Sequence, residues 1–457
     1  MNKTYSNERR YLGISVAFLF LLFFNAHPVR AQIYASSLDK IPAGWNGPVF
    51  TLSHNYPTAV PNDHYPWLAF DFKTQPKQYM QAVLAYFIEG NNEANWVVQN
   101  NRIRTWYHAP SMAWQPANRP NGREFIHGLT RERNSAPKEL WPTQTKTIQN
   151  WAVGFYNAPG AYTFGRVWAD TLQPDVKKGI FPEAAMSGKL LFTAATEQDA
   201  PYLKNALEWD ANINEDVSGT QRKLQKVHLL QLDIAVKDSR STETCWVFGT
   251  FAYNNDAPGN TVWEKMVPVG LMWGNDPGNF TGRNIKESWI NPDFLSLFKF
   301  PDGTTMHIGY KGRLNGPVDN KISSCISCHS TAQSPQFTRL TPDVSKPADL
   351  ALFFRNLKCD VPFSTDNNSV SLDYSLQLSI GIAAAKINGQ RHLEFAISES
   401  ESDKPADFVF TSMDDPNVAP DEPKEEVSKT HWWYWIIGGI ILIIIIRTFN
   451  TNKETTK

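Results

Sequence analysis

The chain contains 457 residues, of which 13% are aromatic and 16 are tryptophan, so it can build a sizeable hydrophobic core. Its formal net charge of -1 provides no field that would attract nucleic acid or acidic ligands, and we expect neither as a partner. Between two hydrophobic end segments lie roughly 400 residues, enough for two or three domains of ~150 residues each.

The N-terminus has the pattern of an exported protein. Basic residues precede an apolar stretch at 12–24, and small residues follow up to Ala31. This order predicts a secretory signal peptide over residues 1–31, cut after Ala31, and a mature chain outside the cytoplasm. The alternative is an uncleaved N-terminal anchor, but ~13 apolar residues fall short of the ~20 that a membrane span needs.

The C-terminal end combines a charged stretch with a second hydrophobic segment. Residues 399–430 are acidic and contain several prolines, which predicts an extended, flexible stalk because such a stretch buries too little apolar surface to fold. The segment 432–446 has no charge, opens with aromatic residues and stops at Arg447. We therefore predict a transmembrane anchor over 431–449 and a cytoplasmic tail at 450–457. A buried globular helix is the weaker alternative, since the segment is apolar on every side.

Strand patterns occupy the middle of the chain, and helical patterns lie on either side. Runs rich in aromatic and β-branched residues, separated by Asn-Asn-Asp and Pro-Gly turns, predict antiparallel strands in a sandwich or a twisted sheet. These runs lie at 227–236, 245–253 and 262–273. Helix formers with suitable end residues predict helices at 77–89 and 347–357, and a third helix is expected within 371–386.

Residues 325–329 read Cys-Ile-Ser-Cys-His and carry the most specific chemical signal in the chain. Two cysteines at this spacing can each form a thioether with one vinyl group of a haem, and the adjacent histidine then reaches the iron. Three other sites would use the same cysteines. A thioredoxin-like site needs a strand before Cys325, where the sequence indicates a loop, and a zinc site would add Cys359 and a histidine. A disulfide between Cys325 and Cys328 would be strained.

The motif resembles the haem-attachment site of the c-type cytochrome family. The rest of the chain is similar to large, uncharacterised bacterial proteins that carry one such motif near the C-terminus. The resemblance implies one covalent haem c, with Cys325 and Cys328 as its thioether cysteines and His329 as its axial iron ligand. Because bacterial c-type cytochromes mature outside the cytoplasm, the resemblance also agrees with export to the periplasm.

Together these patterns predict an α+β fold. We expect a β-rich, antiparallel domain at 32–319, followed by a small, mainly α-helical, cytochrome c-like haem region at 320–398, and then the stalk and the C-terminal transmembrane helix. Cys245 and Cys359, one in each region, are available for a disulfide that would join the two regions in an oxidising compartment. Alternatively, either thiol is simply buried.

The sixth position on the iron has no obvious ligand in the sequence. Small c-type cytochromes usually supply a methionine several dozen residues after the motif, but here the downstream candidates are His392 and Met413, and Met413 lies in the acidic stalk. The upstream candidates are Met272, Met306 and His307. Fixed ligation would suit electron transfer, whereas an open position would let a small molecule bind.

A second cluster of aromatic and polar residues precedes the strands. Aromatic and imidazole groups beside charged side chains can line a ligand pocket or hold haem propionates through arginine. The cluster matches no catalytic spacing, so we favour a structural interpretation in which the aromatic residues are core and the charges form surface pairs. Its members are Trp106, Tyr107, His108, Trp114, Arg123, Glu124, His127 and Arg131.

The sequence favours a membrane-anchored, monohaem c-type cytochrome that exchanges electrons outside the cytoplasm with another redox protein or a membrane electron-transport component. The first alternative is a haem-dependent oxidoreductase or small-ligand sensor, with an open sixth iron position and a pocket in the β-rich domain. The second alternative makes that domain a binding or scaffold module with an auxiliary haem. Both stay open because the region before residue 320 is far larger than an electron carrier needs.

Overall fold

An antiparallel β-sheet lies at the centre of the protein. The computed structural model describes residues 41–110, 122–171, 173–214 and 222–397, which belong to one compact unit of the chain, Met1–Asp414. The predicted signal peptide, stalk, anchor and cytoplasmic tail lie outside the described residues. Within the described ranges, no helix combines the length and the apolar character that a membrane crossing requires.

The strands of the sheet come from the middle of the chain. They are β1 (Thr130–Ser135), β2 (Ile148–Tyr156), β3 (Met186–Thr193), β4 (Glu208–Ile213), β5 (Lys223–Lys237), β6 (Trp246–Tyr253), β7 (Met266–Met272) and β8 (Ser288–Ile290). Their order is β1-β2-β3-β5-β6-β7-β8, with β4 paired to the N-terminal end of the long strand β5. All of these pairs are antiparallel. A separate two-stranded sheet joins β9 (Gln333–Ser334) to β10 (Val370–Ser371).

The described helices are short, apart from two. The α-helices are α2 (Pro76–Ile88), α3 (Ala158–Val167), α4 (Pro292–Leu297), α5 (Cys325–His329), α6 (Pro347–Phe353) and α7 (Leu376–Ile397). The 3-10 helices are η1 (Pro66–Ala69), η2 (Val98–Asn100), η3 (Val176–Lys178), η4 (Pro201–Leu203), η5 (Tyr310–Gly312) and η6 (Asp366–Asn368).

The strand register gives the sheet one apolar face and one partly polar face. Successive side chains of a strand point to opposite faces, so cross-strand partners share a face. Partners on the apolar face are Phe155, Gly188, Ile234, Gly249 and Leu271. Partners on the other face are Gly154, Lys189, Asp233 and Thr250, beside the row of Tyr156, Ser187, Ala235 and Phe248. We call this second side the polar face of the sheet.

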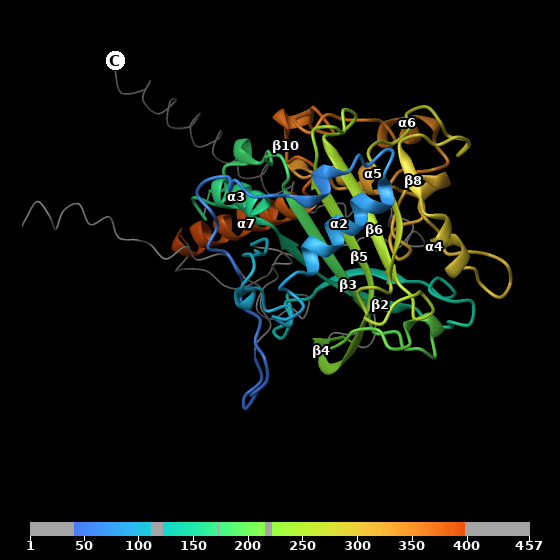
Figure 1. Ribbon diagram of the computed structural model, residues 1–457. Helices are drawn as coiled ribbons and strands as arrows, with labels where there is room; N and C mark the ends of the chain where they lie inside the picture. Colours follow the sequence, from blue (N-terminus) through green and yellow to red (C-terminus); the bar gives the residue numbers. More distant parts are fainter. Residues whose placement is uncertain (1–40, 111–121, 172, 215–221, 398–457) are drawn as a thin grey trace, which may run out of the picture. The chain divides into compact units, whose positions relative to one another are not determined.

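Helix α2 covers the apolar face. Pro76 is preset for the first turn of a helix, and the helix ends just before Gly90, whose φ of 74° suits glycine. Its buried side chains recur at helical spacing: Tyr79, Met80, Val83, Tyr86 and Phe87. The Phe87 ring lies 5.8 Å from that of Phe155 and covers Gly188, where a Cβ would collide with it. Figure 1 shows α2 crossing in front of the strands.

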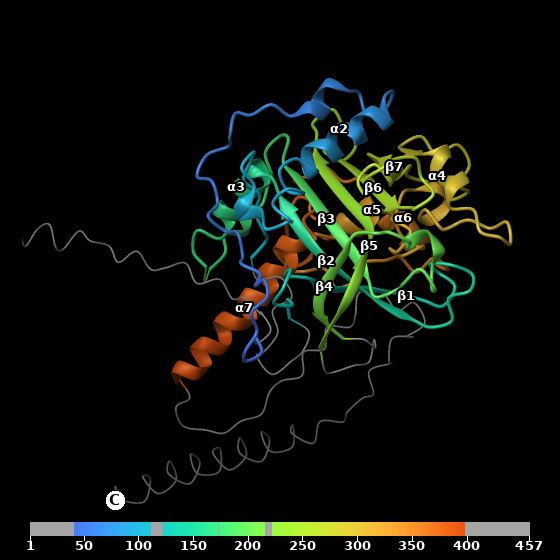
Figure 2. The same cartoon turned by 60° about the horizontal axis from the view of Figure 1, so that its bottom comes forward.

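The C-terminal part of the described chain covers the polar face. In Figures 1 and 2, α2 and α7 lie on opposite sides of the sheet. Helix α5 reaches β6 through His329 and Phe248, whose ring centroids are 5.0 Å apart. A disulfide joins Cys245 to Cys359, which confirms the pairing that the sequence suggested. One hydrophobic core therefore runs from the sheet to the Cys-Ile-Ser-Cys-His helix.

The predicted fold class is wrong in its second part. Residues 320–397 form no small helical cytochrome c-like region, because α5 has five residues, α6 has seven and loops connect them to α7. The apolar residues of this segment, such as Ile326 and Leu378, are buried in the same core as the strands. These residues gain burial against the sheet, while Phe353, Leu357 and Phe363 form a small cluster of their own beside it. The predicted transmembrane helix at 431–449 lies outside the described residues.

Most of the individual elements predicted within the described ranges are present. The helix at 77–89 is α2, and the three strand runs correspond to β5, β6 and β7. The helix predicted at 347–357 ends earlier, as α6, and the helix predicted at 371–386 begins later, as α7, because Ser371 belongs to β10. The strands form one sheet and not a sandwich, since helices and loops cover both of its faces.

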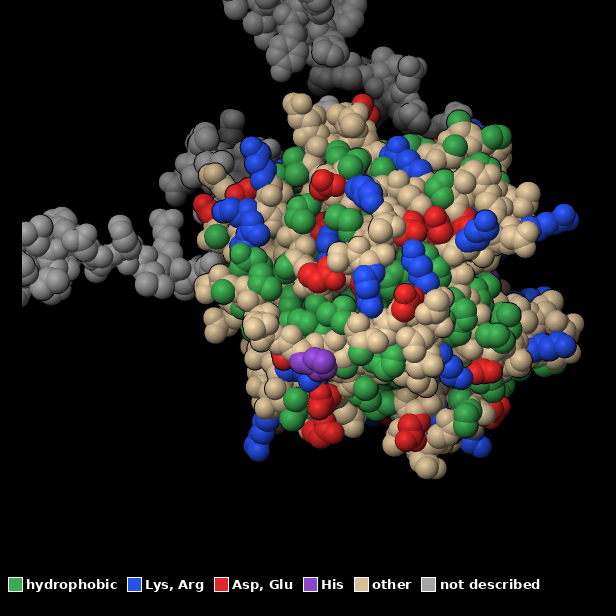
Figure 3. All heavy atoms as spheres, turned by 45° about the horizontal axis from the view of Figure 1, so that its top comes forward, with side chains coloured by type: hydrophobic (Ala, Val, Ile, Leu, Met, Phe, Trp, Pro, Cys, Tyr) green, Lys and Arg blue, Asp and Glu red, His purple; other side chains and the backbone are tan. Residues whose placement is uncertain are grey.

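The surface drawn in Figure 3 does not indicate a nucleic-acid site. Positive and negative side chains are interspersed there with small apolar areas. On this face the described residues form no extended basic patch.

Candidate functional site

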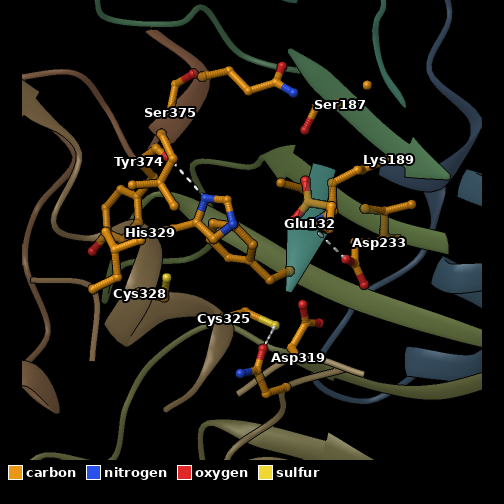
Figure 4. A pocket seen from close by; sticks show the side chains of 18 of the residues that line it. Glu132, Ser187, Lys189, Asp233, Asp319, Cys325, Cys328, His329, Tyr374 and Ser375 are labelled. Atoms are coloured by element: carbon orange, nitrogen blue, oxygen red, sulfur yellow. Dashed lines mark hydrogen bonds and ion pairs between the residues drawn. The ribbon is translucent and has the colours of Figure 1, made fainter. Parts of the chain in front are cut away.

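A cavity of about 280 Å³ lies between the polar face of the sheet and the segment that covers it. Strands β1, β2, β3, β5 and β6 supply one wall, while α5, the loop before it and the start of α7 supply the other. Figure 4 looks into this cavity, where Cys325, Cys328 and His329 lie across from Lys189 and Asp233. The sequence motif and the charged residues of the sheet thus share one space.

Local hydrogen bonds hold the motif helix α5 in place. Ser324 and Ser327 form a capping box, with Ser327 N donating to Ser324 Oγ (3.0 Å) and Ser324 N donating to Ser327 Oγ (2.8 Å). Ser324 Oγ also donates to Asn275 Oδ1 at 2.7 Å, which ties the start of the helix to the loop after β7. The two cysteines and the histidine of residues 325–329 all line the cavity.

One ring nitrogen of His329 is held by the backbone and the other faces the cavity. Its Nδ1 donates to the carbonyl oxygen of Tyr374 at 2.9 Å, and burial lowers its pKa to about 4, so the ring is neutral. Nothing in the described part of the chain hydrogen-bonds to its Nε2, which Figure 4 shows turned toward the side of the cavity where Lys189 and Glu132 lie. Metal-ligating histidines commonly have this arrangement, with one ring nitrogen fixed by a carbonyl and the other bearing a free lone pair.

The Tyr374 carbonyl that orients His329 is held in place by the buried contacts of the neighbouring residue, Asp373. The Asp373 carboxylate pairs with Lys237 Nζ at 2.7 Å, accepts from Trp246 Nε1 at 2.6 Å, and accepts from a backbone N–H at 2.7 Å. Asp373 and Tyr374 both adopt left-handed φ angles, 50° and 65°. This conformation costs about 1–2 kcal/mol per residue, which these contacts offset. The orientation of His329 therefore depends on side chains of β5 and β6.

The zinc alternative does not agree with the structure. Cys359, which that site would require, is bonded to Cys245. Across the described ranges, His, Cys, Asp and Glu side chains form no group of three or more that could hold a metal ion. Neither Cys325 nor Cys328 takes part in a disulfide, so the alternative of a bond between these two is not realised either.

The thioredoxin-like alternative fails on both structure and chemistry. Residues 313–324, which lead into α5, contain no strand. Burial raises the pKa of the Cys325 thiol well above its ordinary value, and the carboxylates of Asp233 and Asp319 add to the rise. A redox-active cysteine requires the opposite shift, because the thiolate is the nucleophile.

A network of charged side chains occupies the sheet side of the cavity. Lys189 Nζ lies 3.3 Å from Asp233 Oδ2 and 3.9 Å from Glu132 Oε2. Gln231 Nε2 donates to Asp233 Oδ1 at 2.8 Å and to Asp319 Oδ2 at 2.9 Å, so it links the two carboxylates. Burial and the nearby Asp319 charge raise the pKa of Asp233 to about 7. Burial opposes the charge on Lys189, but Glu132 and Asp233 outweigh it and raise the pKa of this lysine well above its ordinary value.

Sequence analysis did not find this network. Lys189 and Asp233 alternate with apolar residues along β3 and β5, a pattern that is typical of the solvated face of an antiparallel sheet. What makes them candidates is the covering segment, which turns that face into the wall of a cavity. No local sequence pattern predicts that a distant segment covers this face of the sheet.

The sixth-ligand candidates from the sequence do not line the cavity. Met272 and Met306 are buried in the core, and His307 lies beside Glu139. The side chain of His392 and the whole of Met413 lie outside what the structure describes. Of the described residues that line the cavity, His329 is the only histidine, and none is a methionine.

The cluster around Arg123 is structural, as the sequence favoured, but the prediction that its charged residues form surface pairs is wrong, because Arg123 and Glu124 are buried. Each described member has local partners: His108 Nδ1 lies 3.1 Å from the Gly154 carbonyl, Arg123 donates to the Ala109 carbonyl at 2.9 Å, Glu124 accepts from Ile126 N at 2.7 Å, and His127 stacks on Trp209 at 4.2 Å. Trp106 packs on Tyr86 and Phe87. Of the described members, Arg131 alone lines the cavity, while Trp114 lies outside the described residues.

The residues present therefore fit a c-type haem. Cys325 and Cys328 would hold it, His329 Nε2 would bind the iron, and aromatic side chains such as Tyr156, Trp246 and Phe248 would flank the porphyrin. When bound, the haem supplies an iron centre for electron transfer or for binding a small molecule. The chain's own residues contribute the orientation of the ligand and the charges around it.

Comparison with known proteins does not identify the chain. No protein-family model, no curated protein and no solved structure matches it.

Proposed function

We propose that this chain is a c-type haem protein whose haem would occupy this cavity, with His329 as one iron ligand and the second iron position left for a small molecule. The observation that carries the proposal is the state of His329. It is neutral, is fixed through Nδ1 by the Tyr374 carbonyl, and directs Nε2 into a cavity that Cys325 and Cys328 also line. Such a site suits a haem-dependent oxidoreductase or a small-ligand sensor.

The lining of the cavity favours this function over plain electron transfer. An electron carrier needs a second permanent ligand, usually methionine or histidine, and the described lining offers neither apart from His329. Lys189 is held in its charged form by Glu132 and Asp233, so it has no lone pair for the iron. Electron transfer to a redox partner, which the sequence favoured, is the competing proposal.

The proposal includes export and membrane attachment. The disulfide between Cys245 and Cys359 supports an oxidising compartment, because disulfides persist outside the cytoplasm and are rare inside it. A periplasmic location would also allow a redox protein or a membrane electron-transport component to reach the haem.

Covalent attachment is tested on the purified, full-length protein. Acid-acetone extraction should leave the haem with the polypeptide, and the pyridine-treated protein should show a c-type spectrum. The variant Cys325→Ala, Cys328→Ala should lose covalent haem. The matched control Cys245→Ser, Cys359→Ser should keep it, because these cysteines are bonded to each other and do not belong to the Cys-Ile-Ser-Cys-His motif. Covalent haem that survives in the first variant would overturn the assignment.

Carbon monoxide distinguishes the two functions. If the sixth position faces the cavity, carbon monoxide should bind the reduced native protein fast and completely, as followed by the optical spectrum. Slow or incomplete binding means that a protein ligand must first be displaced. That result would reject the cavity function and favour the electron carrier.

A further inference from the structure

We propose that the carboxylate of Asp233 takes up a proton when the haem iron is reduced, so that electron and proton enter this cavity together. This inference rests on the proposed function, because it requires the haem on Cys325, Cys328 and His329. It assigns a role to charged residues that haem attachment does not use.

The geometry places Asp233 at the centre of a buried network. From β5 itself, Gln231 donates to its Oδ1 at 2.8 Å, and from β6 Thr250 Oγ1 donates to the same oxygen at 2.9 Å. From β3, Lys189 Nζ lies 3.3 Å from its Oδ2. Two further carboxylates face the same space: Glu132 of β1, beside Lys189, and Asp319 of the loop before α5, hydrogen-bonded to Gln231.

Carboxylates outnumber ammonium groups in the part of the network around Asp233. Glu132, Asp233 and Asp319 all act on the ammonium group of Lys189, while two further cations of β1, Arg131 and Arg133, line the same cavity, and Arg133 pairs with Glu139. Gly316 lets the loop approach closely, since a Cβ there would collide with Gln231 and Asp319. Among the described residues, Asp319 Oδ2 accepts hydrogen bonds from the Gln231 amide and from the Gly316 backbone N–H. Both donors are neutral, so they do not balance the charge of the Asp319 carboxylate.

The negative field of this network reaches the haem-attachment motif. Asp233 and Asp319 both act to raise the pKa of the Cys325 thiol, and Asp319 and Lys189 both influence His329. A field that opposes a thiolate at Cys325 also opposes the addition of an electron beside it. Protonation of Asp233 removes one of the charges responsible.

The coupled step balances in charge and atoms. An electron from a reduced redox protein would convert ferric to ferrous iron, and a hydronium ion of the solvent would protonate the Asp233 carboxylate and leave a water molecule. Asp233 is the member of the network suited to this exchange, because its pKa is already raised to about 7 by burial and by Asp319. A small additional field from the reduced iron then shifts its proton occupancy in the neutral range.

The experiment measures the midpoint potential of the haem-loaded, full-length protein by spectroelectrochemistry across a pH series. At acid pH, where Asp233 is protonated in both redox states, the potential should be constant. At higher pH it should fall with a slope that approaches 59 mV per pH unit, the value for one proton per electron. In Asp233→Asn the potential should stay at the acid value throughout.

A second variant removes the cation of the same network instead of the carboxylate. Lys189→Met should move the onset of the slope to higher pH, because Asp233 loses the cation that favours its ionised form. The matched control Asp210→Asn removes an exposed carboxylate of β4, paired with Lys226 at 2.9 Å, and should leave the curve unchanged. A general disturbance of the fold would not shift to higher values the pH at which the midpoint potential begins to fall.

Two results would overturn the inference, and a third would overturn the proposed function instead. A slope that persists unchanged in Asp233→Asn assigns the proton to another group, such as a haem propionate. A flat curve in the haem-loaded wild type shows that no proton is coupled. If pyridine-treated wild-type protein shows no c-type haem, the proposed function itself fails.

Discussion

The buried pair of Asp373 and Lys237 allows a quantitative test of how the sheet supports the site. Replacing Asp373 with alanine leaves three buried donors without an acceptor: the Lys237 ammonium, the indole N–H of Trp246 and a backbone N–H. Replacing Lys237 with methionine leaves a carboxylate that still accepts from the two neutral donors. The two variants should therefore differ in stability although they break the same ion pair.

The magnitudes follow from the burial of the two groups. The side chain of Asp373 is fully buried and that of Lys237 is 8% exposed. Breaking a buried ion pair costs about 3–5 kcal/mol, and each buried donor left without a partner costs about 1–3 kcal/mol. Because these costs are not additive, we expect a loss of about 3 kcal/mol for Lys237→Met and about 5 kcal/mol or more for Asp373→Ala.

Urea unfolding followed by tryptophan fluorescence measures these losses, and the haem spectrum provides a second readout. Asp373→Ala should also change the spectrum, because the Tyr374 carbonyl that orients His329 is no longer anchored. Lys226→Met is the control, since this exposed pair with Asp210 is screened by solvent and should contribute little to stability. If Asp373→Ala costs less than 1 kcal/mol, or less than Lys237→Met, the reasoning is wrong.

Two further predictions concern stability. Removing the disulfide in Cys245→Ser, Cys359→Ser should lower the free energy of unfolding by about 4 kcal/mol, because the bond spans 114 residues; equal urea midpoints for wild type and variant under oxidising conditions would contradict this. Asp233 has a folded pKa of about 7 against an ordinary value of 3.8, so the folded state retains a proton that the unfolded state releases. The unfolding free energy of the wild type minus that of Asp233→Asn should therefore fall as pH rises from about 4 to about 7, and a rising difference would refute the assignment. Buried histidines with lowered pKa values act in the opposite direction in both proteins and cancel in the difference.

Local patterns were sufficient to predict the elements that depend on neighbouring residues. Helix α2 follows from proline at its start, glycine after its end and apolar residues at helical spacing. Strands β5, β6 and β7 follow from their aromatic and β-branched runs. The Cys-Ile-Ser-Cys-His run predicted a haem site at Cys325, Cys328 and His329; haem attachment stays a prediction, and the structure places all three residues on one cavity. Each of these signals lies within a few residues of the feature that it predicts.

The tertiary structure alone decided what surrounds the motif. The cytochrome c-like helical region was the wrong expectation, because α5 and the start of α7 bury their apolar side chains in the core of the sheet, and only a small cluster around Phe353 packs within the segment itself. Lys189 and Asp233 became cavity residues for the same reason: a segment distant in sequence covers a face that would otherwise meet solvent. Even the orientation of His329 depends on Asp373 and its contacts with β5 and β6. Such contacts join residues that are far apart in the sequence, and they form because the whole chain buries its apolar surface together. A short stretch of sequence therefore does not predict them.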